Sequence, residues 1–190
     1  MVDNEYKMSD DVFKTEGYAQ YDDLDTSRIL TYDEMVNTLI ENEGLTKIEA
    51  QKLLDKNFVP IGRNISSRAA TYRTISSQFE VTSIYRPTLN FYCQTSEGGG
   101  SFRGILKILN VGMNRSYGIL SKTFTGSVYT HLQDPNRIYW VVNGDFYNNG
   151  TTTVNGAVSI GLGKTASISF GASNTSGHYK YCYKTGYKYF

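Results

Sequence analysis

The chain has 190 residues, which is enough for one domain with a small appendage and enough to bury a core without metals or many disulfides. It is rich in Tyr (16) and Gly (18) and poor in Pro (3), a composition that favours β structure. No apolar run approaches the roughly 18 residues that a membrane helix requires. The polar, acidic start of the chain does not have the pattern of a signal peptide, so we expect either a cytoplasmic protein or a secreted one whose leader has been removed.

Charge is divided unevenly along the chain. Residues 1–58 hold 14 Asp and Glu against 6 Lys and Arg, a net charge of −8, whereas residues 59–190 hold 4 against 13, a net charge of +9. We therefore expect an acidic N-terminal arm with a helical hairpin (1–58) and a basic, Tyr- and Gly-rich antiparallel β domain (59–190). Opposite charges attract, so the acidic part either packs on the β domain as an appendage or masks a basic surface there.

Two helices are predicted in the acidic part. Thr31 with Glu34, and Thr46 with Glu49, have the spacing of capping boxes, in which the Thr hydroxyl and the Glu carboxylate each satisfy a free amide of the first turn. Gly44 stands where the first helix is expected to end. Two successive short helices also suggest a DNA-binding helix-turn-helix, but a DNA reader needs a basic face. Nucleic acid is therefore not an expected partner.

From about Phe58 the pattern changes to short strands without intervening helices. This organisation predicts a mainly β fold, an antiparallel β-sandwich or flattened β-barrel preceded by the short two-helix segment. The expected strands are Thr71–Ile75, Phe79–Tyr85, Thr88–Thr95, Phe102–Val111, Ser121–His131, Ile138–Val142, Tyr179–Tyr183 and Tyr187–Phe190. A hairpin is expected in addition, between Ile138–Val142 and Tyr179–Tyr183.

This hairpin occupies residues 154–172, where apolar and small polar side chains alternate on both sides of the turn Gly163-Lys164-Thr165. Asn143-Gly144-Asp145 and Asn148-Asn149-Gly150 are predicted turns before it. The pattern fits a hairpin half-buried on a sandwich core. It also fits the amphipathic hairpin of a pore-forming protein. The residues that such a membrane hairpin would turn towards lipid are Val158, Ile160, Leu162, Ile168 and Phe170.

The C-terminal stretch 178–190 holds five Tyr and three Lys. In a strand, the alternation places tyrosines on one face and lysines on the other. Buried, the tyrosines are core residues; exposed, they form an amphipathic surface suited to sugars, membrane interfaces or a protein partner. The candidate binding residues are Trp140, Tyr179, Lys180, Tyr181, Tyr183, Lys184 and Tyr187.

The two cysteines, Cys93 and Cys182, are far apart in sequence and lack the spacing of a zinc site. They predict either one disulfide of a secreted protein or two buried thiols. The alternation argues against pairing, because Cys93 shares a face with apolar residues and Cys182 shares one with lysines. A disulfide would place the protein outside the cytoplasm.

Catalytic patterns are weak. His131 and His178 are not linked by any motif to a nucleophile, and two histidines alone make a poor metal site. Gly98–Gly100 lacks the Lys-Ser/Thr of a phosphate loop. Asp145 lies near aromatic residues, as a sugar-cleaving acid would, although a turn-capping role is the simpler interpretation. We expect no catalytic residue, no metal and no cofactor.

These observations together favour a secreted or cell-surface bacterial protein, non-enzymatic, that uses a basic aromatic β surface to engage an anionic cell-envelope component, a membrane or a protein partner. The bias towards Asn, Tyr, Lys and Ile is typical of a low-GC bacterium. Two alternatives remain at this stage. One is a β-pore-forming toxin or bacteriocin-like protein that inserts residues 154–172, and the other is a glycan-processing enzyme. A cytoplasmic location is the alternative compartment.

Overall fold

The computed structural model describes residues 25–63, 66–97, 103–153 and 158–190. Two helices open the described chain, α2 (Tyr32–Glu43) and α3 (Lys47–Asn57). Both predicted capping boxes are present, and Gly44 ends α2 in the left-handed conformation with φ of 68°. A positive φ is accessible to glycine at little cost, which explains the end of the helix.

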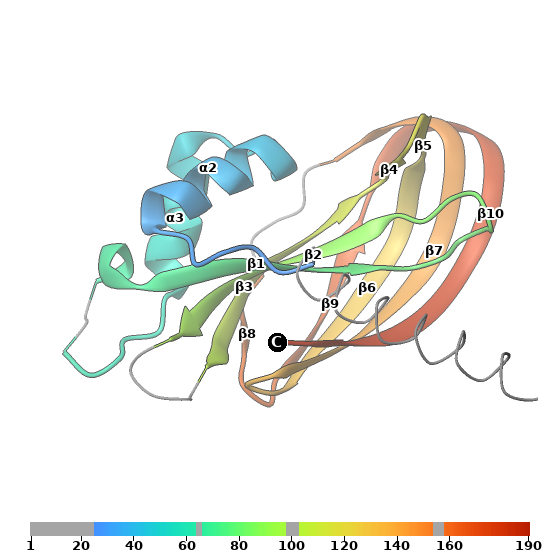
Figure 1. The fold of residues 1–190 in the computed structure, drawn as a ribbon. Helices are drawn as coiled ribbons and strands as arrows, with labels where there is room; N and C mark the ends of the chain where they lie inside the picture. Colours follow the sequence, from blue (N-terminus) through green and yellow to red (C-terminus); the bar gives the residue numbers. More distant parts are fainter. Residues whose placement is uncertain (1–24, 64–65, 98–102, 154–157) are drawn as a thin grey trace, which may run out of the picture.

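Two four-stranded antiparallel sheets follow and form a β-sandwich (Figure 1), which confirms the predicted fold class. The first sheet has the order β1-β2-β3-β8 and the second sheet has the order β10-β7-β6-β9. The bounds are β1 (Thr71–Gln78), β2 (Thr88–Ser96), β3 (Gly104–Asn114), β8 (Ile160–Gly161), β6 (Thr123–Asp134), β7 (Arg137–Thr152), β9 (Thr165–Phe170) and β10 (Ala172–Tyr189). A two-stranded ribbon, β4 (Ser116–Tyr117) with β5 (Leu120–Ser121), and a short 3₁₀ helix at Ser67–Ala69 complete the described elements.

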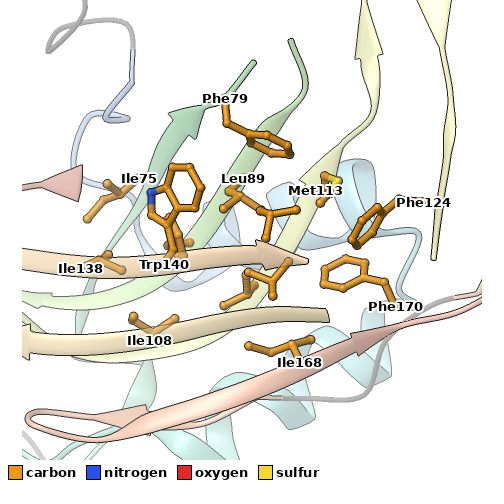
Figure 2. Packing of buried hydrophobic residues seen from close by; sticks show 14 of the residues in the cluster. Ile75, Phe79, Leu89, Ile108, Met113, Phe124, Ile138, Trp140, Ile168 and Phe170 are labelled. Atoms are coloured by element: carbon orange, nitrogen blue, oxygen red, sulfur yellow. The ribbon is translucent and has the colours of Figure 1, made fainter. Parts of the chain in front are cut away.

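The main core lies between the two sheets. Figure 2 shows Ile75, Leu89 and Met113 of the first sheet opposite Ile138, Trp140 and Phe170 of the second. Phe79 joins this cluster from the loop between β1 and β2, with its ring 5.7 Å from that of Trp140. Burying so many large side chains in one cluster is the main stabilising contribution to the sandwich.

A second core lies between the helices and the outer face of the first sheet. Met35 and Leu39 of α2 and Leu54 of α3 are fully buried there, against Tyr72 of β1 and Tyr92 of β2. The acidic helices therefore pack on the β domain, on the side of the first sheet (Figure 1). No described helix lies on the outer face of the second sheet.

One predicted strand and two predicted turns were wrong. The expected strand Phe79–Tyr85 is a loop that closes with a single bridge between Thr82 and Tyr85. Both expected turns between residues 143 and 150 lie inside the long strand β7. Gly144 is required there for packing, because a Cβ would lie 2.7 Å from the ring of Phe124. The sequence alone does not distinguish a glycine that leaves space for a neighbouring side chain from a glycine that forms a turn.

The predicted hairpin at 154–172 was also wrong in its pairing. Residues 154–157 lie outside the described part of the chain. Beyond them, β8 pairs with β3 of the first sheet, whereas β9 pairs with β6 of the second. The turn at Gly163 therefore carries the chain from one sheet to the other. Alternation in the sequence shows which side chains share a face, but it does not show which strand is the partner.

Candidate binding face

The outer face of the second sheet carries a group of exposed aromatic rings that we name the tyrosine face. Four of its members belong to β10, and their exposed fractions lie between 50% and 60%. Two more, on β7 and β6, are partly buried. The tyrosine face consists of Tyr181, Tyr183, Tyr187, Tyr189, Tyr139 and Tyr129.

The rings form a path across three strands. The ring of Tyr129 on β6 lies 6.2 Å from that of Tyr139 on β7, which lies 5.1 Å from Tyr187 on β10. Tyr187 in turn stacks on Tyr189 at 6.3 Å. The strand register explains this order, because Tyr187 pairs directly with Tyr139 in the sheet. Contacts between rings fix side-chain positions that a single exposed tyrosine would leave free.

On β10, the tyrosine face begins at Tyr181, directly after a β-bulge. The register between β10 and β7 shifts between His178 and Lys180, so the side chain of Tyr179 turns towards the inside of the sandwich. There its hydroxyl lies 2.7 Å from the Thr82 hydroxyl, and its ring meets Tyr85 edge-on at 5.8 Å. The prediction that Tyr179 shares a face with Tyr181 and Tyr183 was therefore wrong. An extra residue in a bulge reverses the alternation beyond it.

Trp140 does not lie on the candidate binding surface. Its side chain is 4% exposed and belongs to the core between the sheets. Its neighbours Tyr139 and Val141 face outward instead, because side chains alternate along β7. The expectation that the single tryptophan binds a ligand is thus replaced by a packing role.

Polar and charged side chains lie beside the tyrosine rings on this face. The Tyr181 hydroxyl donates to Asn143 Oδ1 at 2.7 Å. Next to it, His178 Nε2 lies 2.8 Å from an Asp145 carboxylate oxygen. At the other end of the sheet, the Arg137 guanidinium lies 5.9 Å from the Tyr187 ring centroid. The face therefore combines aromatic surface with hydroxyl, amide and charged groups.

The predicted lysines lie on the opposite side of β10. Lys180 and Lys184 are exposed, whereas Lys188 is buried and lies 3.3 Å from Asp25. Because β10 is the edge strand of its sheet, Lys180 and Lys184 project at the rim of the sandwich rather than into its centre. Inward-pointing lysines on an edge strand hinder the addition of a further strand. The tyrosine face, rather than the strand edge, is therefore the surface suited to binding.

The residues predicted to face lipid in a membrane hairpin do not form one exposed apolar surface. Ile160, Ile168 and Phe170 are 0%, 5% and 7% exposed and belong to the core between the sheets. Val158 packs partly buried against this core, and Leu162, in the turn, is 52% exposed. No helix in the described ranges is long and apolar enough to cross a membrane.

Both cysteines are free, buried thiols in the structure and do not form the predicted disulfide. Cys93 lies on the first sheet and Cys182 on the second, both within the core cluster. Burial raises the pKa of both thiols, because the charged thiolate is poorly solvated there. In the part of the chain that the structure describes, no three His, Cys, Asp or Glu side chains are grouped as metal ligands.

The sequence-based prediction included Tyr181, Tyr183 and Tyr187 of this face but missed Tyr189 on the same strand and, on β6 and β7, Tyr129 and Tyr139. These two occupy odd positions between buried even-numbered residues of β6 and β7, so the same alternation could have found them. Comparison with models of protein families, with curated proteins and with solved structures found no match for this chain.

Proposed function

We propose that this protein is a non-enzymatic binding protein whose tyrosine face engages an anionic polysaccharide of a cell envelope. The observation that carries the proposal is the path of tyrosine rings across β6, β7 and β10, on a face that no described helix covers. A ligand that meets such a face must be extended, because the contact surface spreads over three strands.

Tyrosine suits this task for a physical reason. Its ring offers a large contact area and its hydroxyl a hydrogen bond, while only two torsions are immobilised on binding. Contacts such as that between Tyr139 and Tyr187 already hold the rings in the free protein. Preorganisation of this kind lowers the entropic cost of association.

Charge favours an anionic rather than a neutral polymer. Residues 59–190 carry a net charge of +9, and Lys180 and Lys184 lie exposed at the rim of the sandwich, on the side of β10 opposite to the tyrosines. Arg137 adds a guanidinium beside Tyr187. Clustered positive charge raises the local concentration of an anionic ligand and speeds its association, an effect that salt weakens.

Insertion into a membrane is less well supported. Ile160, Ile168 and Phe170, which would have to face lipid, belong to the core between the sheets. Withdrawing them into lipid would remove three large side chains from the packed core and leave cavities between the sheets. This cost favours a protein that binds with its sandwich intact.

The test is co-sedimentation with polygalacturonate beads, dextran beads and vesicles that contain phosphatidylglycerol. We expect binding to polygalacturonate that weakens with salt, and little binding to dextran. The double variant Tyr183→Ala with Tyr187→Ala should lose most of the binding, whereas Ile48→Ala, which removes an exposed side chain from α3, should keep it. Failure to bind polygalacturonate at low salt contradicts the proposal, and vesicle leakage would favour the pore-forming alternative.

One observation favours a second candidate, a glycan-processing enzyme. Asp145 and His178 are hydrogen-bonded beside Tyr181, so an acid–base pair lies next to the tyrosine face. If the protein released reducing ends from polygalacturonate, and Asp145→Asn abolished this release without loss of binding, the enzyme would replace the binding protein as the better proposal.

A further inference from the structure

A second site lies away from the tyrosine face, where the C-terminal part of α2 meets the first sheet and the β4–β5 ribbon. A pocket of about 420 Å³ opens there. This volume falls within the range of about 300–1,000 Å³ that is usual for small-molecule sites. Its lining consists of Glu41, Asn42, Asn90, Met113, Asn114, Arg115, Ser116 and Ser121.

The lining is polar, and much of its hydrogen-bonding capacity remains for a ligand. Asn90 Oδ1 accepts from the Ser76 hydroxyl at 2.7 Å, and Asn114 Oδ1 accepts from the Ser116 amide at 3.0 Å. The Asn90 side chain also forms a hydrogen bond with the Tyr92 hydroxyl. A carboxamide has two N–H donors, so Asn90 keeps one and Asn114 keeps both. Met113 is the single apolar residue of the lining, so an apolar ligand would find little complementary surface.

Arg115 is fixed in place within this lining. Its guanidinium donates to the Met113 carbonyl at 3.2 Å and to Thr152 Oγ1 at 3.1 Å. These two bonds use two of the five N–H donors of an arginine. The group is therefore held rigidly and retains donors, which is the arrangement expected of a recognition residue.

A partly buried carboxylate, that of Glu43, lies next to the pocket and offsets the charge of Arg115. Glu43 accepts a hydrogen bond of 2.5 Å from the Tyr92 hydroxyl, and its carboxylate rests on Gly112, where a Cβ would overlap it. Glu43 also interacts electrostatically with Arg115. Burying these polar groups costs free energy that an apolar contact would not cost. Together with Glu41, the carboxylates disfavour an anion in the pocket.

We propose that this pocket binds a small, neutral, polyhydroxylated ligand, namely a single sugar unit. Amides, serine hydroxyls, a carboxylate and a guanidinium offer both donors and acceptors, which is what the hydroxyl groups of a sugar require. A phosphate would meet the Glu41 carboxylate in the lining, and an apolar ligand would meet only Met113. The site is separate from the tyrosine face, so it does not depend on the function proposed for that face.

The test is titration of the ¹⁵N-labelled protein with glucose, galactose, N-acetylglucosamine and, separately, inorganic phosphate, followed by NMR. We expect at least one sugar to shift the side-chain amides of Asn90 and Asn114. Glu41→Gln should weaken this binding about tenfold, because a charged acceptor is replaced by a neutral one. Asp33→Asn, the same change on the exposed first turn of α2, is the matched control and should bind as the unmodified protein does.

Three outcomes would overturn the proposal. One is that no sugar shifts the pocket residues at millimolar concentrations. Another is that phosphate shifts them and the sugars do not, which would make the site an anion site. The last is equal binding by Glu41→Gln and Asp33→Asn, which would show that the carboxylate in the pocket wall takes no part.

Discussion

Gly186 of β10 lies directly against the indole of Trp140 on β7. A Cβ at position 186 would lie 2.7 Å from Trp140 Cε2, closer than side-chain atoms approach in folded proteins. The edge strand can therefore follow β7 closely only because this position is a glycine. Tyr187, the next residue, projects from the other side of the strand onto the tyrosine face. The core and the candidate binding surface are thus connected through the backbone of β10.

Gly186→Ala should destabilise the protein by about 1–3 kcal/mol, because the added methyl group overpacks a filled site. Urea unfolding followed by tryptophan fluorescence measures the change. Thr185→Ala is the matched control, since Thr185 is exposed on the same strand and its loss should change the free energy of unfolding by less than about 0.5 kcal/mol. Equal effects of the two substitutions would show that the close contact at Gly186 does not constrain the strand.

Trp140→Ala should lower the free energy of unfolding by about 3–5 kcal/mol, as expected when a large buried aromatic side chain is removed. The milder Trp140→Phe keeps part of the packing and should leave enough folded protein for a binding measurement. We expect this variant to bind polygalacturonate as the unmodified protein does. If binding fell in a variant that remained folded, Trp140 would be a binding residue, as its sequence context first suggested.

Local patterns predicted local structure well. Both helices were predicted because the capping boxes Thr31–Glu34 and Thr46–Glu49 bring together residues three positions apart. The sandwich was predicted because short strands succeed one another without helices. These features depend on neighbours in sequence, so a single chain is sufficient to infer them.

The errors concern interactions between residues that are distant in sequence. Gly144 resembles a turn glycine, but it packs against Phe124 across the sheet. Trp140 resembles a sugar-binding residue, but it fills the core. Tyr179 follows the alternation of β10 until a bulge reverses it. In each case the local sequence was compatible with two structural roles, and tertiary packing determined which of them the residue has.

Glu43 predicts a dependence of stability on pH. Burial raises the pKa of its carboxyl above the ordinary 4.5, and the hydrogen bond from Tyr92 and the charge of Arg115 only partly offset this. A raised pKa in the folded state contributes stability that is fully present below pH 4.5 and is lost as the pH rises through the folded value. The free energy of unfolding relative to Glu43→Gln should therefore fall as the pH rises from 4.5 towards neutrality.

Urea unfolding of both proteins across this pH range checks the prediction. Glu34 offers a contrast, because Arg28 and the backbone of Thr31 lower the pKa of its carboxyl to about 2. The contribution of Glu34 should be lost as the pH falls, which is the opposite direction. A difference between the unmodified protein and Glu43→Gln that stays constant with pH would mean that Glu43 titrates normally.

The two thiols should be unreactive in the folded protein and reactive after unfolding. Cys93 is fully buried and Cys182 is 3% exposed, and burial raises the pKa of both. Because the thiolate is the nucleophile, alkylation by iodoacetamide should be slow in native protein. In denaturant without a reductant, mass spectrometry should find both cysteines alkylated. Protein that takes up no label until a reductant is added would contain a disulfide, contrary to the structure.

The lysines on β10 should protect its edge from pairing with another strand. Lys180 and Lys184 are exposed on the long edge strand of the second sheet, where a further strand could otherwise add. The double variant Lys180→Val with Lys184→Val should associate with itself, which sedimentation velocity would record as an increase in mean mass. Lys164→Val removes a lysine from an exposed turn and is the matched control. If both variants sedimented as the unmodified protein does, the bulges of β10 rather than its lysines would keep the edge unpaired, because a bulge disrupts the hydrogen-bond ladder that an added strand needs.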